Sequence, residues 1–324
     1  MAEQTVHVRC SSDIRRSLQQ TGIGGRFVES SDPVCQGPVP GDLDDTDLIA
    51  VRARFIAAAY GGGEAGCRRR LLAELAAFDA IGADDAIVLW FEHDLFDQAV
   101  LIRLLDRLAR RPAQRLPTQL ICIDSFPEID RFIGLGQLAP EQLASLLPQA
   151  KPVSGDQYDL GRVAWRAFRQ ADPRDLWAMA EAGTPALPML AGALRRHLMD
   201  LPGRRDGLAL TERLCLRAVA GGATTPGGIF QALREKLEPQ PFLGDLMLWP
   251  ILQRLSEAPQ PALTAFAAWN DSLDLTDFGK ALLDDGAEWC AANPLDRWLG
   301  GIHLTGTRPA WRWDDAAGRP VAAG

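Results

Sequence analysis

Hydrophobic positions follow two spacings along the first part of the chain, and these spacings predict alternating strands and helices. Short apolar runs rich in β-branched and aromatic residues predict strands over residues 5–10, 26–29, 87–91 and 118–123. Apolar residues at every third or fourth position predict helices over residues 14–20, 48–60, 67–79 and 95–108. The alternation is typical of an open, mostly parallel α/β sheet with right-handed crossovers. A linker is expected over residues 112–117.

The pattern changes after residue 139, where helical spacing continues and no strand is predicted up to residue 202. Three further helices, over residues 211–220, 225–236 and 244–258, precede a candidate hairpin of residues 262–269 with 272–275, and together they indicate a winged helix. A second hairpin is expected between residues 301–305 and 310–313. We therefore expect an α/β domain (1–139), a helical connector (140–205), a winged-helix-like domain (206–290) and a Trp/Gly-rich tail (291–324) packed on the body.

Polar side chains follow each of the four predicted strands. They are Ser11, Ser12 and Asp13; Glu29, Ser30 and Asp32; Glu92, His93 and Asp94; and Asp124 and Ser125. The carboxyl ends of parallel strands meet at one edge of a sheet, where open α/β folds bind their ligands. The sequence therefore predicts a small-molecule site at this edge.

The segment Glu92-His93-Asp94, with Asp97 and Gln98, is open to three interpretations. Asp94 can cap the following helix, with Asp97 completing a capping-box-like arrangement. Alternatively, Glu92 and His93 serve as an acid/base pair, because histidine titrates near neutral pH and a carboxylate can fix its tautomer. A metal site of His93 with Asp94, Asp97 or Asp124 is the weakest, because the chain has four histidines and no HxH or HExxH spacing.

Two further loops carry a structural and a functional interpretation each. The proline-punctuated segment from Asp32 to Pro38 is a rigid turn, or a lip over the sheet edge with Asp32 and Gln36 as polar contacts. One of Ser11, Ser12 and Asp13 is expected to cap the next helix, or these residues form an anion site. No GxGxxG, Walker or GxSxG motif is present, so no cofactor is assigned.

Charge and cysteine usage restrict the partners. The net charge of −8 argues against a protein that mainly binds nucleic acid. No apolar run reaches the length of a membrane span, and residues 1–9 are not expected to act as a signal peptide because they lack an apolar core. The six cysteines contain no CxxC and are expected to be reduced thiols in a cytoplasmic protein. His197, between arginines on a helix, is expected at the surface.

The predicted winged helix is poorly suited to DNA. Its third helix, over residues 244–258, contains one basic residue, Arg254, and is interrupted by Pro250, while the wing around Asp271 is acidic. Base readout requires Arg, Lys, Asn or Gln on the recognition helix. We therefore favour a protein partner or a structural role over DNA.

Several strings resemble a bacterial family defined only as the domain of unknown function 1835. They are SDPVCQGPVP at residues 31–40, LWFEHDLFDQ at 89–98, GLGQLAPEQL at 134–143, LDRWLGGIHLTG at 295–306 and the terminal WRWD. The resemblance covers most of the chain. It implies no activity and no catalytic residue.

The sequence thus predicts a site for a small polar or anionic ligand in a hydrolase- or transferase-like acid/base enzyme. Glu92 and His93 are the catalytic candidates. The candidate ligand-binding residues are Ser11, Ser12, Asp32, Asp94, Asp97, Gln98 and Asp124. The alternatives are a ligand-sensing regulator or interaction module that uses the winged helix, and a scaffold in which these residues only cap helices and turns.

Overall fold

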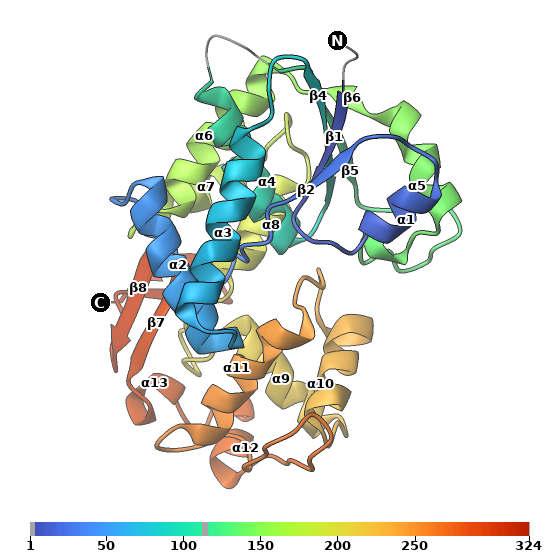
Figure 1. The fold of residues 1–324 in the computed structure, drawn as a ribbon. Helices are drawn as coiled ribbons and strands as arrows, with labels where there is room; N and C mark the ends of the chain where they lie inside the picture. Colours follow the sequence, from blue (N-terminus) through green and yellow to red (C-terminus); the bar gives the residue numbers. More distant parts are fainter. Residues whose placement is uncertain (1–3, 112–115, 324) are drawn as a thin grey trace.

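The N-terminal part of the computed structural model, which describes residues 4–111 and 116–323, is built on a five-stranded sheet (Figure 1). Its order is β2-β1-β4-β5-β6. Neighbouring strands are parallel except for the last pair. The strands are β1 (Gln4–Arg9), β2 (Arg26–Glu29), β4 (Asp85–Glu92), β5 (Thr118–Ile123) and β6 (Lys151–Pro152). The predicted, mostly parallel α/β sheet is confirmed.

One prediction for the N-terminal part is wrong. No strand was predicted between residues 140 and 202, but Lys151 and Pro152 pair with Leu120 and Gln119 of β5. The pair is only two residues long, too short to give a periodic signal. The linker expected over residues 112–117 lies mostly outside the described residues.

The chain changes direction across the sheet between β1 and β4. Helix α1 (Arg15–Gln20) connects β1 to β2 on one side, whereas α4 (Leu95–Ala109) connects β4 to β5 on the other. Figure 1 shows α1 and α5 (Pro140–Leu146) on one face of the sheet and α3 (Glu64–Asp79) and α4 on the opposite face. Such a topological switch point leaves a crevice at the carboxyl ends of the two strands.

Strand β4 is buried on both faces, which explains its continuous apolar sequence. Val88 and Trp90 belong to the core cluster that contains α1 and α5. Ile87, Leu89 and Phe91 belong to the cluster that contains α4. Successive side chains of a strand point to opposite faces, so both helical layers receive apolar residues from the same strand.

Helices cover the α4 face in two groups. Helices α2 (Asp45–Tyr60) and α3 pack against each other, while α6 (Gly155–Phe168) and α8 (Leu190–Leu198) pack against α4. Helix α7 (Arg174–Ala182) joins α6 and α8. His197 on α8 is buried and stacks on Phe168, with ring centroids 4.3 Å apart. The prediction that His197 lies at the surface is wrong, because His197 is on the buried face of α8.

The C-terminal part contains the predicted helices but only a remnant of the predicted wing. Leu263 and Leu275 form one isolated bridge in place of two strands. The carboxylate of Asp271 accepts hydrogen bonds from the N–H groups of Ala267 and Ala268, so this segment turns instead of extending. The helices are α9 (Leu210–Ala220), α10 (Pro226–Ala232), the π-helical η3 (Leu233–Leu237), α11 (Asp245–Glu257), α12 (Asp277–Leu283) and α13 (Trp289–Ala292).

The tail forms two small antiparallel pairs. Strand β7 (Leu295–Gly300) pairs with β8 (Ile302–Gly306), and β9 (Trp311–Asp314) pairs with β10 (Arg319–Ala322). The predicted pairing of residues 301–305 with 310–313 is wrong, because Gly300, at a φ of 58°, lets the chain turn back one strand earlier. Strand β3 (Gly37–Pro38) adds to β7 in parallel, which brings an early loop beside the tail.

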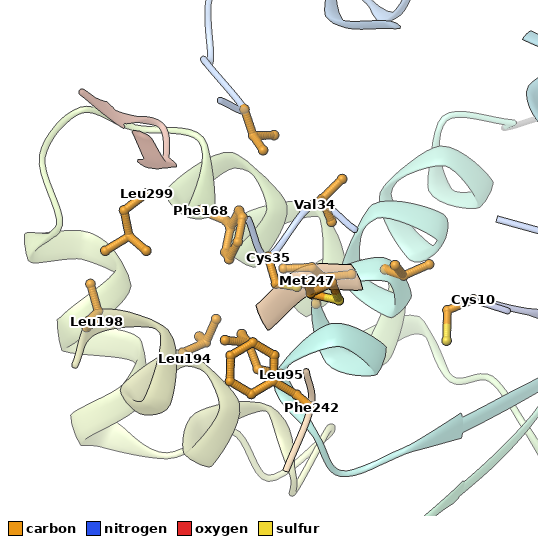
Figure 2. Packing of buried hydrophobic residues seen from close by; sticks show 14 of the residues in the cluster. Cys10, Val34, Cys35, Leu95, Phe168, Leu194, Leu198, Phe242, Met247 and Leu299 are labelled. Atoms are coloured by element: carbon orange, nitrogen blue, oxygen red, sulfur yellow. The ribbon is translucent and has the colours of Figure 1, made fainter. Parts of the chain in front are cut away.

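One apolar core runs through both parts of the molecule. Its buried members extend from Val6 to Trp313. Figure 2 shows Phe242 and Met247 from the C-terminal part among residues of the N-terminal part, which include Cys35 and Leu95. Within the described ranges, no helix combines the length and apolarity needed to cross a membrane.

Candidate functional site

A cavity of about 360 Å³ lies at the carboxyl ends of β1 and β4, at the topological switch point. We call it the Glu92 cavity. Three segments line it: the strand ends with the start of α4, the loop that contains η1 (Leu135–Gln137), and the region from α10 to α11. The lining residues are Arg9, Cys10, Ser11, Asp13, Glu92, Asp94, Phe96, Asp97, Ile133, Gly134, Gly136, Gln137, Phe230, Arg234, Pro241, Phe242, Leu243, Gly244 and Met247.

Arg9, the last residue of β1, organises the charges of this cavity. Its guanidinium is almost fully buried and donates through Nε and Nη2 to the two carboxylate oxygens of Asp13, at 2.6 and 2.7 Å. Nη1 donates to Asp97 Oδ1 at 2.9 Å, and Nη2 also approaches Glu92 Oε2 at 3.2 Å. One positive charge is therefore shared among three carboxyl groups.

The start of α4 is fixed by carboxylates that accept backbone N–H groups. Asp94 accepts from the N–H of Asp97 at 2.8 Å, so the predicted helix cap is confirmed. The carboxylate of Asp97 accepts from the N–H of Glu92 at 2.9 Å rather than closing a capping box on Asp94. Asp97 also accepts the Cys10 thiol at 3.0 Å. Burial raises the pKa of this thiol well above its ordinary value, so Cys10 is a donor and not a nucleophile.

Glu92 holds its proton more tightly than an ordinary glutamate. Burial and the neighbouring Asp97 charge raise the pKa of Glu92 to about 8, although Arg9 and the Leu135 N–H, which donates to Oε2, act in the opposite direction. Burial and the charges of Asp97 and Glu92 raise the pKa of Asp94 well above its usual value. Glu92 therefore faces the cavity as a protonated acid at neutral pH, and Asp94 beside it also holds its proton more tightly than an ordinary aspartate.

Asp13 has the opposite protonation state. Burial opposes ionisation, but the hydrogen bonds and charge of Arg9 outweigh it and lower the pKa of Asp13 below its ordinary value. An ionised and a protonated carboxyl group therefore line the same cavity. Environments that separate the pKa values of neighbouring carboxyl groups in this way are typical of acid/base sites.

The same carboxyl groups resemble a cation-binding set. Glu92, Asp94 and Asp97 each offer one oxygen, and these oxygens lie within 4.8 Å of one another. Carboxylate oxygens are the ligands that Mg²⁺ and Ca²⁺ prefer. Arg9 already donates to Glu92 and Asp97, so a cation would compete with the guanidinium. His93 is not a member of this set, so these three carboxyl groups are not the His93-containing metal site considered from the sequence.

His93 points away from the Glu92 cavity. Its ring lies 6.1 Å from that of Phe132, which belongs to the core cluster on the α1 face. Its Nδ1 is buried without a hydrogen-bond partner among the described residues, and burial lowers the pKa of the ring. Successive side chains of an extended segment point in opposite directions, so Glu92 and His93 do not form an acid/base pair.

The other predicted site residues are spread over three environments. Ser11 lines the cavity and donates to Asp13 Oδ1 at 2.6 Å, whereas Ser12 and Asp124 are exposed and do not line it. Gln98 is buried below the edge and donates to the Glu92 carbonyl at 2.6 Å. Asp32 is buried outside the cavity. The helix cap expected from residues 11–13 is wrong, because α1 begins after Ile14 without a side-chain cap.

Asp32 is an internal ion-pair partner and does not face the cavity. It accepts hydrogen bonds from Arg52 at 2.9 Å and from Arg103 at 2.8 Å. Arg52 is fully buried and also donates to the carbonyl oxygens of Gln36 and Pro33. The structural interpretation of this proline-punctuated loop therefore has direct support.

The sequence analysis did not identify Arg9 as a site residue, nor the loop that contains Gly134 and Gly136. An arginine at the end of an otherwise apolar strand was a usable signal, because a buried charge requires partners. A Cβ atom on Gly134 would collide with the Glu92 carboxylate, and one on Gly136 would lie 3.0 Å from Asp13 Oδ2. The segments 89–98 and 134–143 thus lie in contact at the carboxyl group of Glu92. The wall from Phe230 to Met247 had no local signal.

Neither a scan against protein-family models nor a search among curated proteins found a match to this chain. The geometry of the Glu92 cavity is therefore the basis for assigning a function.

Proposed function

We propose that the protein binds a small polar molecule in the Glu92 cavity and that Glu92 acts on it as a general acid. The observation that carries this proposal is a buried carboxyl group, with a pKa raised to about 8, that lines a cavity at the switch point of the sheet. A general acid works best when its pKa lies near the working pH.

The lining of the cavity supports a bound organic molecule. Apolar side chains, including Phe96, Phe230 and Phe242, lie beside the carboxyl groups and the loop that contains Gly134. The volume falls within the range of small-molecule pockets, which combine apolar walls with a few polar groups. The position between two parts of the chain is also common for such sites.

Hydrolysis and group transfer are the reaction classes that use this arrangement. In both, a protonated acid donates to the leaving atom, and an ionised carboxylate accepts a proton from the attacking group. Glu92 takes the first role and Asp13 the second, with Arg9 positioning both. We do not assign a role to His93, because it lies on the other face of the strand.

A thermal-shift screen with polar metabolites tests this proposal. A molecule that binds only the folded state raises the melting temperature by mass action. We expect hits whose stabilisation is lost in Glu92→Gln and retained in His93→Gln, the adjacent control. Hits that respond equally to both substitutions, or a library without hits, would contradict the proposal.

A ligand-sensing regulator is the second candidate, because residues 230–247 of the C-terminal part form one wall of the same cavity. We propose that the helices α9 to α12 with the Leu263–Leu275 bridge act as a winged-helix-like module for a protein partner. The single arginine of α11, Arg254, is engaged by Glu212 at 2.8 Å, which leaves little basic surface for DNA. Salt-sensitive, sequence-selective binding in a gel-shift titration would instead favour a DNA-binding regulator.

Membership of the domain of unknown function 1835 family and a cytoplasmic location remain proposals from the sequence. The first rests on the strings quoted above, and the second on the use of cysteine. All six cysteines are free thiols in the structure.

A further inference from the structure

A second cavity, of about 440 Å³, lies where α4 and α6 end, and arginine side chains dominate it. Arg110 comes from the C-cap of α4, while Arg162, Arg166 and Arg169 come from α6 and its C-cap. We call these four residues and their cavity the arginine pocket. Helix α4 has 15 residues and begins beside Glu92. At 1.5 Å per residue, the two cavities lie about 20 Å apart along this helix.

The positive charge of the arginine pocket is only partly balanced. Asp106 is the one carboxylate among its lining residues, and it pairs with Arg110. Arginines near helix C-termini also compensate the helix dipole, which is equivalent to about half a negative charge at each end. Asp45 also lies 4.0 Å from Arg110, and Asp159 pairs with Arg162 at the rim. Arg166 and Arg169 are therefore the two pocket arginines without a carboxylate within salt-bridge distance among the described residues, on a protein whose net charge is −8.

Arg169 is the rigid part of the pocket. Its side chain is buried, and it donates to the carbonyl oxygens of Pro40 at 2.7 Å and Leu43 at 2.7 Å, with no carboxylate partner within salt-bridge distance among the described residues. The guanidinium also lies 5.7 Å from the ring centroid of Trp165. Burial is the main cause of the lowered pKa of Arg169; the charges of Arg110 and Arg103 act in the same direction, and those of Asp45 and Asp106 oppose them. A bound anion would stabilise this buried charge.

Arg162 and Arg166 supply exposed donors around the buried Arg169. They are four residues apart on α6, so they project from the same face, and both are exposed. Arg162 has a weak partner in the exposed Asp159 at 3.2 Å, and no carboxylate lies within salt-bridge distance of Arg166 in the described part of the chain. Guanidinium groups form forked, charge-assisted hydrogen bonds to phosphate oxygens.

We propose that the arginine pocket binds a phosphate dianion, either free or carried by a small phosphate ester. Two guanidinium groups of the pocket, those of Arg166 and Arg169, have no carboxylate partner among the described residues and can pair with a dianion, and the volume of the pocket leaves room for an ester substituent. Arg169 holds the phosphate at the base of the pocket, and Arg162 and Arg166 close over it.

The test is isothermal titration calorimetry on the full chain at constant ionic strength, with inorganic phosphate and glycerol 3-phosphate as probes and chloride as the reference anion. The variant Arg162→Gln/Arg166→Gln removes two exposed side chains of the pocket. The control Arg68→Gln/Arg69→Gln removes two exposed arginines of α3 and changes the net charge equally. The single variant Arg166→Gln provides a milder form of the same test, and melting temperatures without phosphate verify the fold.

We expect phosphate affinity to fall at least tenfold in Arg162→Gln/Arg166→Gln and to stay within twofold in the control. Equal affinity for both probes would identify free phosphate as the ligand, and tighter binding of the ester would identify a phosphorylated molecule. The proposal is overturned if phosphate binds no better than chloride. It is also overturned if the control weakens binding as much as the pocket variant.

Discussion

Arg9 influences the protonation of the carboxyl groups that line the Glu92 cavity, because its guanidinium contacts them at unequal distances. Asp13 receives two short hydrogen bonds and Asp97 one, whereas Glu92 receives the longest contact, at 3.2 Å. A carboxyl group that is buried and poorly neutralised retains its proton. Burial and the Asp97 charge raise the pKa of Glu92, and its long contact with Arg9 does not offset them, whereas the short hydrogen bonds from Arg9 lower the pKa of Asp13 despite burial.

The raised pKa predicts a specific dependence of stability on pH. The folded state binds the Glu92 proton more tightly than the unfolded chain, so its contribution to stability is complete below pH 4.5 and is lost as pH rises through about 8. Within this window, the stability of the wild type relative to Glu92→Gln falls by at most about 1.4 kcal/mol per pH unit. Urea unfolding of both proteins between pH 5 and pH 9 would measure the difference, and a constant difference would refute the assignment.

Gly134 is expected to be required because of its contact with Glu92 as well as its backbone conformation. Gly134→Ala should destabilise the protein by about 1–3 kcal/mol more than Gly22→Ala, because an added methyl group overpacks the Glu92 carboxylate. Both glycines have a positive φ, but a Cβ on Gly22 meets nothing within 4 Å. Denaturant midpoints of the two variants provide the comparison. Equal losses would show that only backbone strain matters at Gly134.

At the scale of elements, the loop before α2 depends on one buried arginine of that helix. Arg52 pairs with Asp32 and donates to the carbonyl oxygens of Gln36, Pro33 and Pro38. These bonds hold the segment from which β3 extends to pair with β7. The loop is therefore a structural element that ties the sheet domain to the tail.

Arg52→Met should destabilise the protein strongly. Removal of one partner from a buried ion pair leaves an uncompensated charge, here on Asp32, at a cost of about 3–5 kcal/mol, of which Arg103 recovers a part. Arg54→Met, two positions along the same helix, is the control, because its side chain is 73% exposed. Guanidinium unfolding should show a change within about 0.5 kcal/mol for the control. Similar effects of both substitutions would contradict the account of this loop.

Elements were predictable from the sequence where their signals are local. The strand β4, the cap at Asp94 and the helix α4 follow from neighbouring residues, and each lies where the pattern predicts it. The hairpins of the C-terminal part were not predictable, because the choice of partner strand depends on turns and contacts elsewhere. Gly300 ends β7 and reverses the chain there. The segments of β8 and β9 were predicted as extended, whereas β7 was not predicted.

At the scale of the whole molecule, the N-terminal and C-terminal parts are joined by packing and by polar contacts. The largest core cluster includes residues from both, such as Leu95 and Phe242. Arg131 also donates to the carbonyl oxygens of Arg234 and Glu238, each at 3.0 Å, beside the Glu92 cavity. The wall that closes the cavity is more than 100 residues from Glu92 in the sequence, which is why no local pattern revealed it.

The shared core predicts cooperative unfolding. Tryptophan fluorescence reports on both parts, through Trp90 in β4 and Trp249 in α11, and far-UV circular dichroism reports on all helices. We expect the two probes to give one coincident transition in urea, because neither part can lose its packing without exposing the other. Two separated transitions would show that the parts fold as independent domains.

The most direct test of the central claim is the pKa of Glu92 itself. Carboxyl ¹³C NMR of protein labelled at glutamate, with Glu92 assigned by its absence in Glu92→Gln, follows the titration of this group. Our account predicts a midpoint near 8. A midpoint near the ordinary glutamate value of 4.5 would mean that Glu92 is ionised at neutral pH, and would contradict its role as a general acid.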